Sequence, residues 1–504
     1  MKKDIINSLS IKEKLAQMFI MGFSGFELVQ ENLNIQKAVK MGLGGIIFFA
    51  NNIKSIEQTS NLSKSLQNMA KIPLFISIDQ EGGLVERTIN CKEKLEYLTP
   101  MALCSTGKVE NVKAHTEIMA QELRAMNINM DFAPVLDVNT NKNNPIIGIR
   151  AFSNDPEKVI KYSEAVYKTL KENNIMAVGK HFPGHGEAWA DSHLEMPAIN
   201  LDFNELEKIH IKPFKKAVEN GLYAIMVAHV HYSAFNQTEK IPASLSKEVV
   251  TGYLKDKLGF EGLIISDDMA MGGITRHYEE LTACIKAINA GIDLLIFRDS
   301  MNIQLLDKLA DAVGDGLISE EKINQSVGKI LSSKEKYNII DGLNQEIENL
   351  DITKEQIKID SIALESIKIE KKGDLIPLNK ANKVLILSPD KSQIHSYAQD
   401  RQKISDFLKL TSCKEVSYSL NPDDIEIQQI KEEIKSSDIV IFISYNAILN
   451  QRQIELFKEI NKPVIAIAAG IPYDAEKFQK ADTILLSFGY KTPALKALAS
   501  IISG

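Results

Sequence analysis

Short apolar runs alternate with longer amphipathic segments over the first 300 residues of the chain. Runs of this length, separated by helical patterns, are typical of repeated βα units whose strands are buried in a parallel sheet. Eight such runs occur, at 18–23, 44–50, 73–80, 130–138, 175–182, 223–230, 262–268 and 291–298. Eight parallel strands within this length is the count of a TIM-type barrel. We therefore predict a (β/α)8 barrel, a fold of the α/β class.

A second set of apolar runs follows the barrel and again alternates with charged helical patterns. These runs lie at 383–388, 438–446, 462–470 and 482–490. Their spacing predicts a small α/β sandwich domain. Accordingly, we expect a barrel domain over 1–340, a linker over 341–374 and a C-terminal α/β sandwich domain over 375–504.

Polar side chains collect at the C-terminal ends of the barrel runs. They are Asp79, Asp137, Lys180, His181, His229, His231, Asp267, Asp268 and Arg298. In a TIM barrel this end of the strands is the catalytic face. Loops also begin there, so any one of these residues has an ordinary structural explanation. Their concentration over most of the runs favours a functional site.

Charge and cysteine content indicate which partners and which cellular compartment to expect. The 504 residues carry 59 Lys and Arg against 66 Asp and Glu, a net charge of −7, and no basic stripe interleaved with aromatics. Nucleic acid is therefore not an expected partner. The four cysteines are widely spaced and form no CxxC pair, which is typical of a reducing compartment and predicts a cytoplasmic protein.

No segment predicts export or membrane attachment. Charged residues at 12–14 interrupt the apolar part of the N-terminus, so we expect no signal peptide and no anchor. No run approaches the ~18 to 20 apolar residues that a membrane span needs.

The stretch KHFPGHGEAWADSHLEMP, from Lys180 to Pro197, carries an Asp-X-His pair at Asp191 and His193. An aspartate that accepts a hydrogen bond from one imidazole nitrogen leaves the other nitrogen free to exchange a proton with a substrate. A helix-capping aspartate beside a surface histidine is the simpler explanation of the same tripeptide.

Asp267, at the end of the run GLIISDD, is a second candidate. A carboxylate that faces an acid/base group across a sugar is the arrangement of a retaining glycosidase. Asp268 is expected to bond to the backbone of the following segment, although the sequence barely separates the two. Charged residues on the same rim, Asp79, Arg87, Arg150, Lys180 and His181, suit a polyol, or form an ion-pair network of their own.

The histidines also permit a metal site. His229 and His231, together with His181, His185 and His193, provide enough imidazoles for zinc in a barrel. Against this reading, the pair at 229 and 231 lies on a different loop from Asp191 and His193.

The motifs IDQEGG, APVLDV, KHFPGHG, DSHLEMP and IISDDMAM, in that order, resemble glycoside hydrolase family 3, specifically its β-N-acetylglucosaminidase branch. The resemblance covers roughly residues 10–340. It implies that Asp267 is the nucleophile and that His193 is the general acid/base, with Asp191 as its partner. It also implies that Asp79, Arg87, Arg150, Lys180, His181 and His185 bind the terminal N-acetylglucosamine. No metal and no cofactor are implied.

The same resemblance implies a retaining exo-β-N-acetylglucosaminidase that acts on cell-wall muropeptide fragments in the cytoplasm. Two alternatives remain: a phosphorylase that uses phosphate in place of water, and an inactive sugar-binding sensor. We expect a small carbohydrate as substrate, no nucleic-acid or membrane partner, and a monomer or homodimer.

Three positions depart from the usual pattern of the branch: Leu84, Ala151 and Glu187. They lie on the rim and bear on affinity more than on reaction class. The loop 183–191 is predicted to be mobile and to close over the substrate. For the C-terminal domain we expect a structural or dimer-forming role, with capping of the active site as the alternative.

Overall fold

The computed structural model describes residues 2–192, 194–299, 301–340, 350–394 and 400–504. Eight parallel strands close into a barrel in the order β1-β10-β9-β7-β5-β4-β3-β2. Their bounds are β1 Phe19–Met21, β2 Gly45–Phe48, β3 Phe75–Ile78, β4 Met130–Asp131, β5 Met176–Phe182, β7 Ala224–Val227, β9 Leu263–Asp268 and β10 Leu294–Phe297. Each strand lies inside one of the eight apolar runs, so the predicted TIM-type barrel is confirmed.

The barrel strands are buried along almost their whole length. In these strands only Asp267 and Asp268, at the end of β9, are half-buried; the other residues are buried. Helices cover the outer face of the sheet and the side chains of the strands fill its interior, which explains the nearly continuous apolar runs. The end of β9 is therefore where the barrel opens toward solvent.

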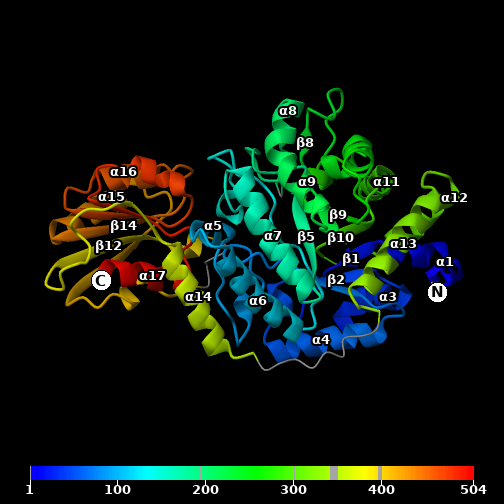
Figure 1. Cartoon of the computed structure of the whole chain (residues 1–504), viewed down its shortest axis with the longest axis horizontal. Helices are drawn as coiled ribbons and strands as arrows, with labels where there is room; N and C mark the ends of the chain where they lie inside the picture. The colour runs from blue at the N-terminus through cyan, green and yellow to red at the C-terminus, as the bar shows by residue number, and fades with distance from the viewer. Residues whose placement is uncertain (1, 193, 300, 341–349, 395–399) are drawn as a thin grey trace.

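Helices surround the barrel (Figure 1). The main ones are α2 Ile11–Gln17, α3 Leu33–Met41, α4 Ile56–Met69, α6 Val109–Ala125, α7 Pro156–Glu172, α9 Lys212–Glu219, α11 Glu280–Ala290, α12 Gln304–Gly314 and α13 Glu320–Lys336, with α1 Lys2–Ser8 before them. The sequence marks several helix ends. The Ser10 and Asp155 side chains accept N-cap hydrogen bonds from Glu13 N and Glu157 N, and Gly42 ends α3 in the left-handed conformation.

The C-terminal domain contains a six-stranded sheet in the order β11-β16-β15-β14-β12-β13. The strands are β11 Lys368–Lys371, β12 Lys383–Pro389, β13 Ser412–Tyr418, β14 Ile439–Ser444, β15 Val464–Ala468 and β16 Thr483–Leu486. Only the pairing of β11 with β16 is antiparallel. The accompanying helices are α15 Asp424–Lys435, α16 Arg452–Lys458 and α17 Thr492–Ser503. The α/β sandwich is therefore confirmed.

Part of the segment 341–374, which we expected to be a linker, has regular structure. Helix α14 spans Ile352–Ser366 and packs against α17 and α5 (Pro100–Ser105), and β11 is an edge strand of the C-terminal sheet. Figure 1 shows α14 between the barrel and the C-terminal sheet. The exact domain boundaries stay a prediction. Among the residues described, no helix combines the length and apolar character needed to cross a bilayer.

Candidate active site

A buried ion-pair network lies at the carboxyl ends of β3 and β5. Lys180, on β5, places Nζ 2.7 Å from Asp79 Oδ1 and 2.7 Å from Glu81 Oε1. Glu81 also accepts hydrogen bonds from Arg150, at 2.9 Å from Nε and 2.7 Å from Nη2. Paired contacts of this kind between a guanidinium and a carboxylate restrict the orientation of both groups. The network therefore holds its hydrogen-bond donors and acceptors in fixed orientations.

Electrostatics keep this network ionised. Burial would raise the pKa of Glu81, but the charges of Arg150 and Lys180 outweigh it and lower the pKa to about 2. For Asp79, Lys180 and Arg87 likewise overcome burial and hold the pKa well below its ordinary value. Burial disfavours the charged form of Lys180, yet the two carboxylates raise its pKa. At neutral pH both carboxylates are charged acceptors and Lys180 is a charged donor.

Arg87 extends the network toward β2. Its Nη2 lies 3.3 Å from Asp79 Oδ2, and its guanidinium lies over the ring of Phe49 at 5.2 Å from the centroid. Arg298 covers the same ring at 5.0 Å. The buried Nε of Arg87 has no hydrogen-bond partner within the described part of the chain.

Asp137, just after β4, holds the neighbouring histidines. Its Oδ2 lies 2.7 Å from His181 Nδ1, and its Oδ1 accepts a hydrogen bond from His185 N at 2.6 Å. Burial would raise the pKa of Asp137, but His181 lowers it to about 2. A carboxylate only accepts, so Nδ1 of His181 carries the hydrogen, and this bond orients the ring.

His185 joins two parts of its own loop. Its ring is buried, and Nε2 lies 3.0 Å from Ser192 Oγ. Burial, followed by the charge of His181, lowers the pKa of His185 to about 4, so this imidazole is neutral at pH 7. Its contacts hold the segment next to Asp191.

Asp267 and Asp268 end β9 and have different surroundings. Asp268 Oδ1 accepts hydrogen bonds from Ala270 N at 3.0 Å and Arg298 N at 3.1 Å, and burial raises its pKa. Asp267 Oδ1 accepts one from Asp268 N at 2.8 Å. The bonding of Asp268 to backbone agrees with its expected structural role. Asp267 is the better candidate for chemistry at the barrel mouth.

The first half of the loop 183–191 is tied to the segment that follows β4. Asn144 Nδ2 donates to the carbonyl oxygens of His185 at 2.9 Å and Gly186 at 3.1 Å. A Cβ on Gly186 would lie 1.8 Å from Val138 O, so no other residue fits there without movement. The expected motion of this loop stays a prediction.

The second half of the loop lies next to the segment that follows Asp267. Gly273 N donates to Ser192 O at 3.1 Å, which brings the Asp191 segment beside the end of β9. Trp189 is 63% exposed, whereas its alanine neighbours are buried. His193, the predicted acid/base, lies outside the described residues.

The histidines proposed for a metal site have other contacts. His229 Nδ1 lies 2.7 Å from Ser244 Oγ and its Nε2 lies 3.0 Å from Asp268 O, while His231 Nδ1 lies 3.1 Å from Ile241 O. Within the ranges that the structure describes, no three His, Cys, Asp or Glu side chains are grouped to hold a metal ion.

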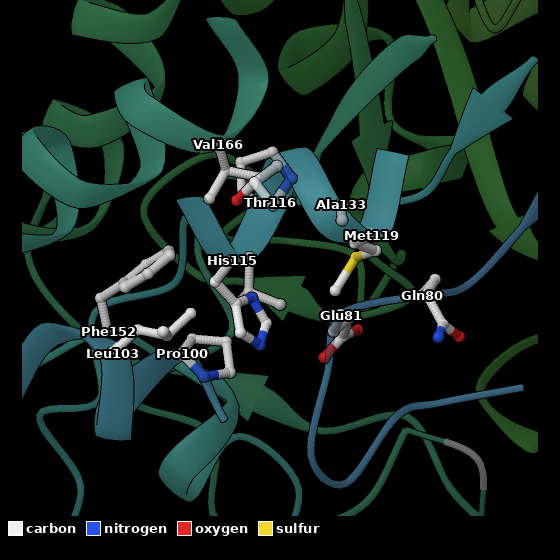
Figure 2. Close-up of a pocket in the computed structure, with 12 residues that line it drawn as sticks. Gln80, Glu81, Pro100, Leu103, His115, Thr116, Met119, Ala133, Phe152 and Val166 are labelled. Atoms are coloured by element: carbon white, nitrogen blue, oxygen red, sulfur yellow. The ribbon is translucent and has the colours of Figure 1, made fainter. Parts of the chain in front are cut away.

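Figure 2 shows a small cavity behind Glu81. Gln80 and Glu81 line one side, and His115 and Thr116 of α6 line another; its volume is about 20 Å³. Ligand pockets usually enclose about 300–1,000 Å³, whereas a single water needs only about 10–15 Å³ of this kind of volume. The cavity accommodates at most a water molecule and is no sugar site.

The structure brings most of the predicted site residues together at one end of the barrel. Asp79, Arg87, Arg150 and Lys180 share one ion-pair network, and His181 is the next residue of β5. Sequence reasoning missed Glu81 as the residue that joins Lys180 to Arg150, and Asp137 as the partner of His181. Glu81 directly follows the run 73–80 and Asp137 lies near the end of the run 130–138, and these positions were the available signal.

The chain is similar in sequence to one protein family and to several known proteins. The model of the glycosyl hydrolase family 3 N-terminal domain matches residues 10–333. The chain is 31% identical over 436 residues to beta-hexosaminidase A of Pseudoalteromonas piscicida, covering 79% of this chain and 70% of that protein. It is 38% identical over 260 residues to the beta-hexosaminidase of Tolumonas auensis, covering 50% of this chain and 75% of that protein.

A solved structure is similar over both domains. The glycoside hydrolase family 3 beta-N-acetylglucosaminidase from a Paenibacillus species superposes with a TM-score of 0.91 at 30% sequence identity. The match covers 99% of this chain and 97% of that one. The similarity therefore extends through the C-terminal sheet as well as the barrel.

Proposed function

Because the chain belongs to glycosyl hydrolase family 3 and is a glycoside hydrolase of the β-N-acetylhexosaminidase type, we propose that it releases terminal β-linked N-acetylglucosamine with retention of configuration. One observation carries the proposal: Asp267 is half-buried at the barrel mouth that also contains the ion-pair network around Lys180. A nucleophile at one side of the mouth and a rigid set of hydroxyl ligands at the other suit a pyranose.

In the first step Asp267 attacks the anomeric carbon, and the bond between this carbon and the glycosidic oxygen breaks. His193 donates a proton to the departing oxygen, and Asp191 orients the imidazole and stabilises its charged form. In the second step His193 takes a proton from water, whose oxygen displaces the Asp267 carboxylate from the sugar. The products are N-acetylglucosamine and the remainder of the substrate, which is the leaving group of the first step. Asp267 and His193 return to their original states.

The ion-pair network holds the sugar during both steps. The Asp79 carboxylate accepts hydrogen bonds from sugar hydroxyls, and the Lys180 ammonium and the guanidinium groups of Arg87 and Arg150 donate them. Because each of these groups is already fixed by a partner, little conformational entropy is lost on binding. His181, oriented by Asp137, adds a further polar contact.

We place the substrate among N-acetylglucosaminyl fragments of the bacterial cell wall, on the strength of the motif between Lys180 and Pro197. All four cysteines are unpaired, which supports a reducing compartment such as the cytoplasm. Incubation with muropeptides of defined reducing end, followed by mass spectrometry of the products, tests which sugar is accepted as the leaving group. Equal or better cleavage of N-acetylglucosamine oligomers would contradict it.

Trapping with a 5-fluoro-N-acetylglucosaminyl fluoride tests the nucleophile. We expect one added glycosyl group on the peptide that contains Asp267, no labelling of Asp267→Asn, and normal labelling of the Asp268→Asn control. Labelling of a peptide without Asp267 would overturn the assignment. Lack of both turnover and labelling in folded protein would favour the sugar-binding sensor.

Product analysis in phosphate buffer separates hydrolysis from phosphorolysis. We expect free N-acetylglucosamine, at a rate independent of phosphate concentration. Accumulation of N-acetylglucosamine 1-phosphate would establish the phosphorylase alternative.

A further inference from the structure

Two loops of the C-terminal domain contact the loops that carry the barrel's substrate-binding arginines. They are 469–477, after β15, and 487–491, after β16. Both follow parallel strands, so they emerge at the same edge of the C-terminal sheet. Figure 1 shows this domain against the barrel near α5.

The loop 487–491 contacts the barrel segment after β3. Lys491 Nζ lies 2.8 Å from Glu86 Oε2, and the two side chains are only 9% and 2% exposed. Thr99 Oγ1 donates a hydrogen bond to Phe488 O at 2.6 Å. Thr99 also packs on the tip of the barrel segment, since a Cβ on Gly83 would lie 2.2 Å from Thr99 Cγ2. The two domains are therefore joined by a buried ion pair and a buried hydrogen bond.

Glu86 belongs to a tight loop whose two arms carry site residues. Glu81 N donates to Val85 O at 2.9 Å, and Arg87 N donates to Gln80 Oε1 at 2.8 Å. These bonds couple the arm with Glu81 to the arm with Arg87. A displacement of Glu86 therefore shifts both arms.

The loop 469–477 contacts the barrel segment that leads to Arg150. Tyr473 OH donates to Asn139 O at 3.4 Å, and a Cβ on Gly148 would lie 3.3 Å from Ile471 Cγ2. Asn139 in turn accepts a hydrogen bond from Gly148 N at 3.1 Å, two residues before Arg150. The contact between Tyr473 and Asn139 is therefore linked to Arg150 through the short helical turn Gly148–Arg150.

The loop 469–477 is itself rigid enough to hold another loop. Asp474 is buried, and its Oδ2 accepts hydrogen bonds from Ser444 Oγ and Ala447 N, both at 2.8 Å. Its Oδ1 accepts one from Ile448 N at 3.2 Å. These bonds fix the loop to the end of β14, so the position of Tyr473 follows that of the C-terminal sheet.

We infer that the C-terminal domain sets the positions of Arg87 and Arg150, with Lys491 and Tyr473 as positioning residues. The inference rests on the proposed function, because it concerns the site that binds the terminal N-acetylglucosamine. It gives the domain a part in substrate affinity, in addition to the structural role expected from the sequence. Lys491 acts through Glu86, and neither residue contacts the sugar.

The test compares Lys491→Met, Lys491→Arg and the control Lys496→Met. Lys496 forms an ion pair with Asp360 at 2.6 Å, between α17 and α14 and away from the site loops. For Lys491→Met we expect KM and the product inhibition constant of N-acetylglucosamine to rise about tenfold, while kcat changes less than threefold. Lys491→Arg should restore both constants to within about threefold, and Lys496→Met should leave them unchanged.

A double variant separates positioning from stability. Lys491→Met alone leaves the buried Glu86 without its cation, which can unfold the protein. In Lys491→Met with Glu86→Gln no buried charge is unpaired, so we expect the melting temperature to recover. The inhibition constant should stay raised, because the tether between the domains is still absent. Recovery of both quantities would overturn the inference.

Hydrogen exchange gives a readout that does not need catalysis. Amide protection in peptides covering 79–98 should fall in Lys491→Met and in the double variant, and in peptides covering 139–150 it should fall in Tyr473→Ala. Unchanged protection and unchanged inhibition constants would refute the positioning role. Failure of the wild type to bind N-acetylglucosamine would instead refute the proposed function, and the exchange result would still decide whether the domain holds these loops.

Discussion

Replacement of Glu81 by glutamine tests how much the site depends on a residue that the sequence did not identify. Glu81 accepts three charge-assisted hydrogen bonds, one from Lys180 and two from Arg150. Glutamine has nearly the same volume but only one acceptor oxygen. Its NH2 group must face a donor of one of the two cations, so at least one of the three bonds is lost.

The size of the effect follows from these contacts. A hydrogen bond to a charged group contributes about 1.5–3 kcal/mol, and a neutral acceptor roughly halves the strength of the two bonds that remain. The total loss of stability is about 3–6 kcal/mol. This range includes the usual cost of about 3–5 kcal/mol for removing one partner from a buried ion pair. Looser placement of Lys180 and Arg150 weakens their bonds to the sugar, for which we expect a 10- to 100-fold loss of kcat/KM, about 1.4–2.8 kcal/mol.

The assay combines steady-state hydrolysis of a chromogenic N-acetylglucosaminide with thermal unfolding followed by circular dichroism. Glu219→Gln is the matched control, since Glu219 pairs with Lys216 at 2.6 Å in a solvent-exposed position. We expect the control to behave as the wild type. A Glu81→Gln protein with kcat/KM within twofold of the wild type and an unchanged melting temperature would refute the reasoning.

The pH dependence gives an independent check on Glu81. Its folded-state pKa of about 2 is below the ordinary 4.5, so the folded protein favours the carboxylate. The resulting stability is complete above about pH 4.5 and disappears as the pH falls toward 2. The difference in melting temperature between wild type and Glu81→Gln should therefore shrink over this range; a constant difference would contradict the assignment.

Three further predictions concern other parts of the barrel. Asp268→Ala should lower the melting temperature but keep kcat/KM within about tenfold, since it removes the oxygen that accepts hydrogen bonds from Ala270 N and Arg298 N; complete loss of turnover would make Asp268 a candidate nucleophile. Gly186→Ala should reduce kcat/KM at least tenfold with little effect on the rest of the fold, because its Cβ would lie 1.8 Å from Val138 O; an unchanged rate would show that the loop adapts. Burial lowers the pKa of Lys334 to about 7, so the unfolded chain binds this proton more tightly and the contribution of Lys334 to stability should rise from pH 7 to 10. Relative to the wild type, Lys334→Met should lose this contribution, and its melting temperature at pH 7 should be higher because the burial cost is reduced.

The barrel and four strands of the second domain were predictable because they are buried on both faces. Such strands need nearly continuous apolar runs, and these runs are visible without a structure. The two strands of the second domain that the sequence did not predict are the edges of its sheet. All four residues of β11 are exposed, and only Tyr418 of β13 is buried. An edge strand packs few side chains, so its sequence resembles a loop.

The residues of the candidate site also divide into those that the sequence predicted and those that it did not. Asp79, Lys180 and Asp267 could be found because each ends a buried run, where a barrel places its catalytic face. Glu81 looked like one more polar residue in a glycine-rich turn, because its partners lie 69 and 99 residues away along the chain. Pairing across such separations depends on which strands become neighbours.

The sequence by itself determined the fold class, the position of the barrel strands and the end of the barrel at which charged residues gather, since these depend on local periodicity and burial. Only the tertiary structure decided which charges neutralise one another and how the C-terminal domain contacts the site. Lys180 lies between two carboxylates because β5 ends near the segment that follows β3 in the same barrel. Lys491 contacts Glu86 because loops from two different sheets meet. Electrostatic interactions depend on distance in space, and the folded chain alone sets that distance.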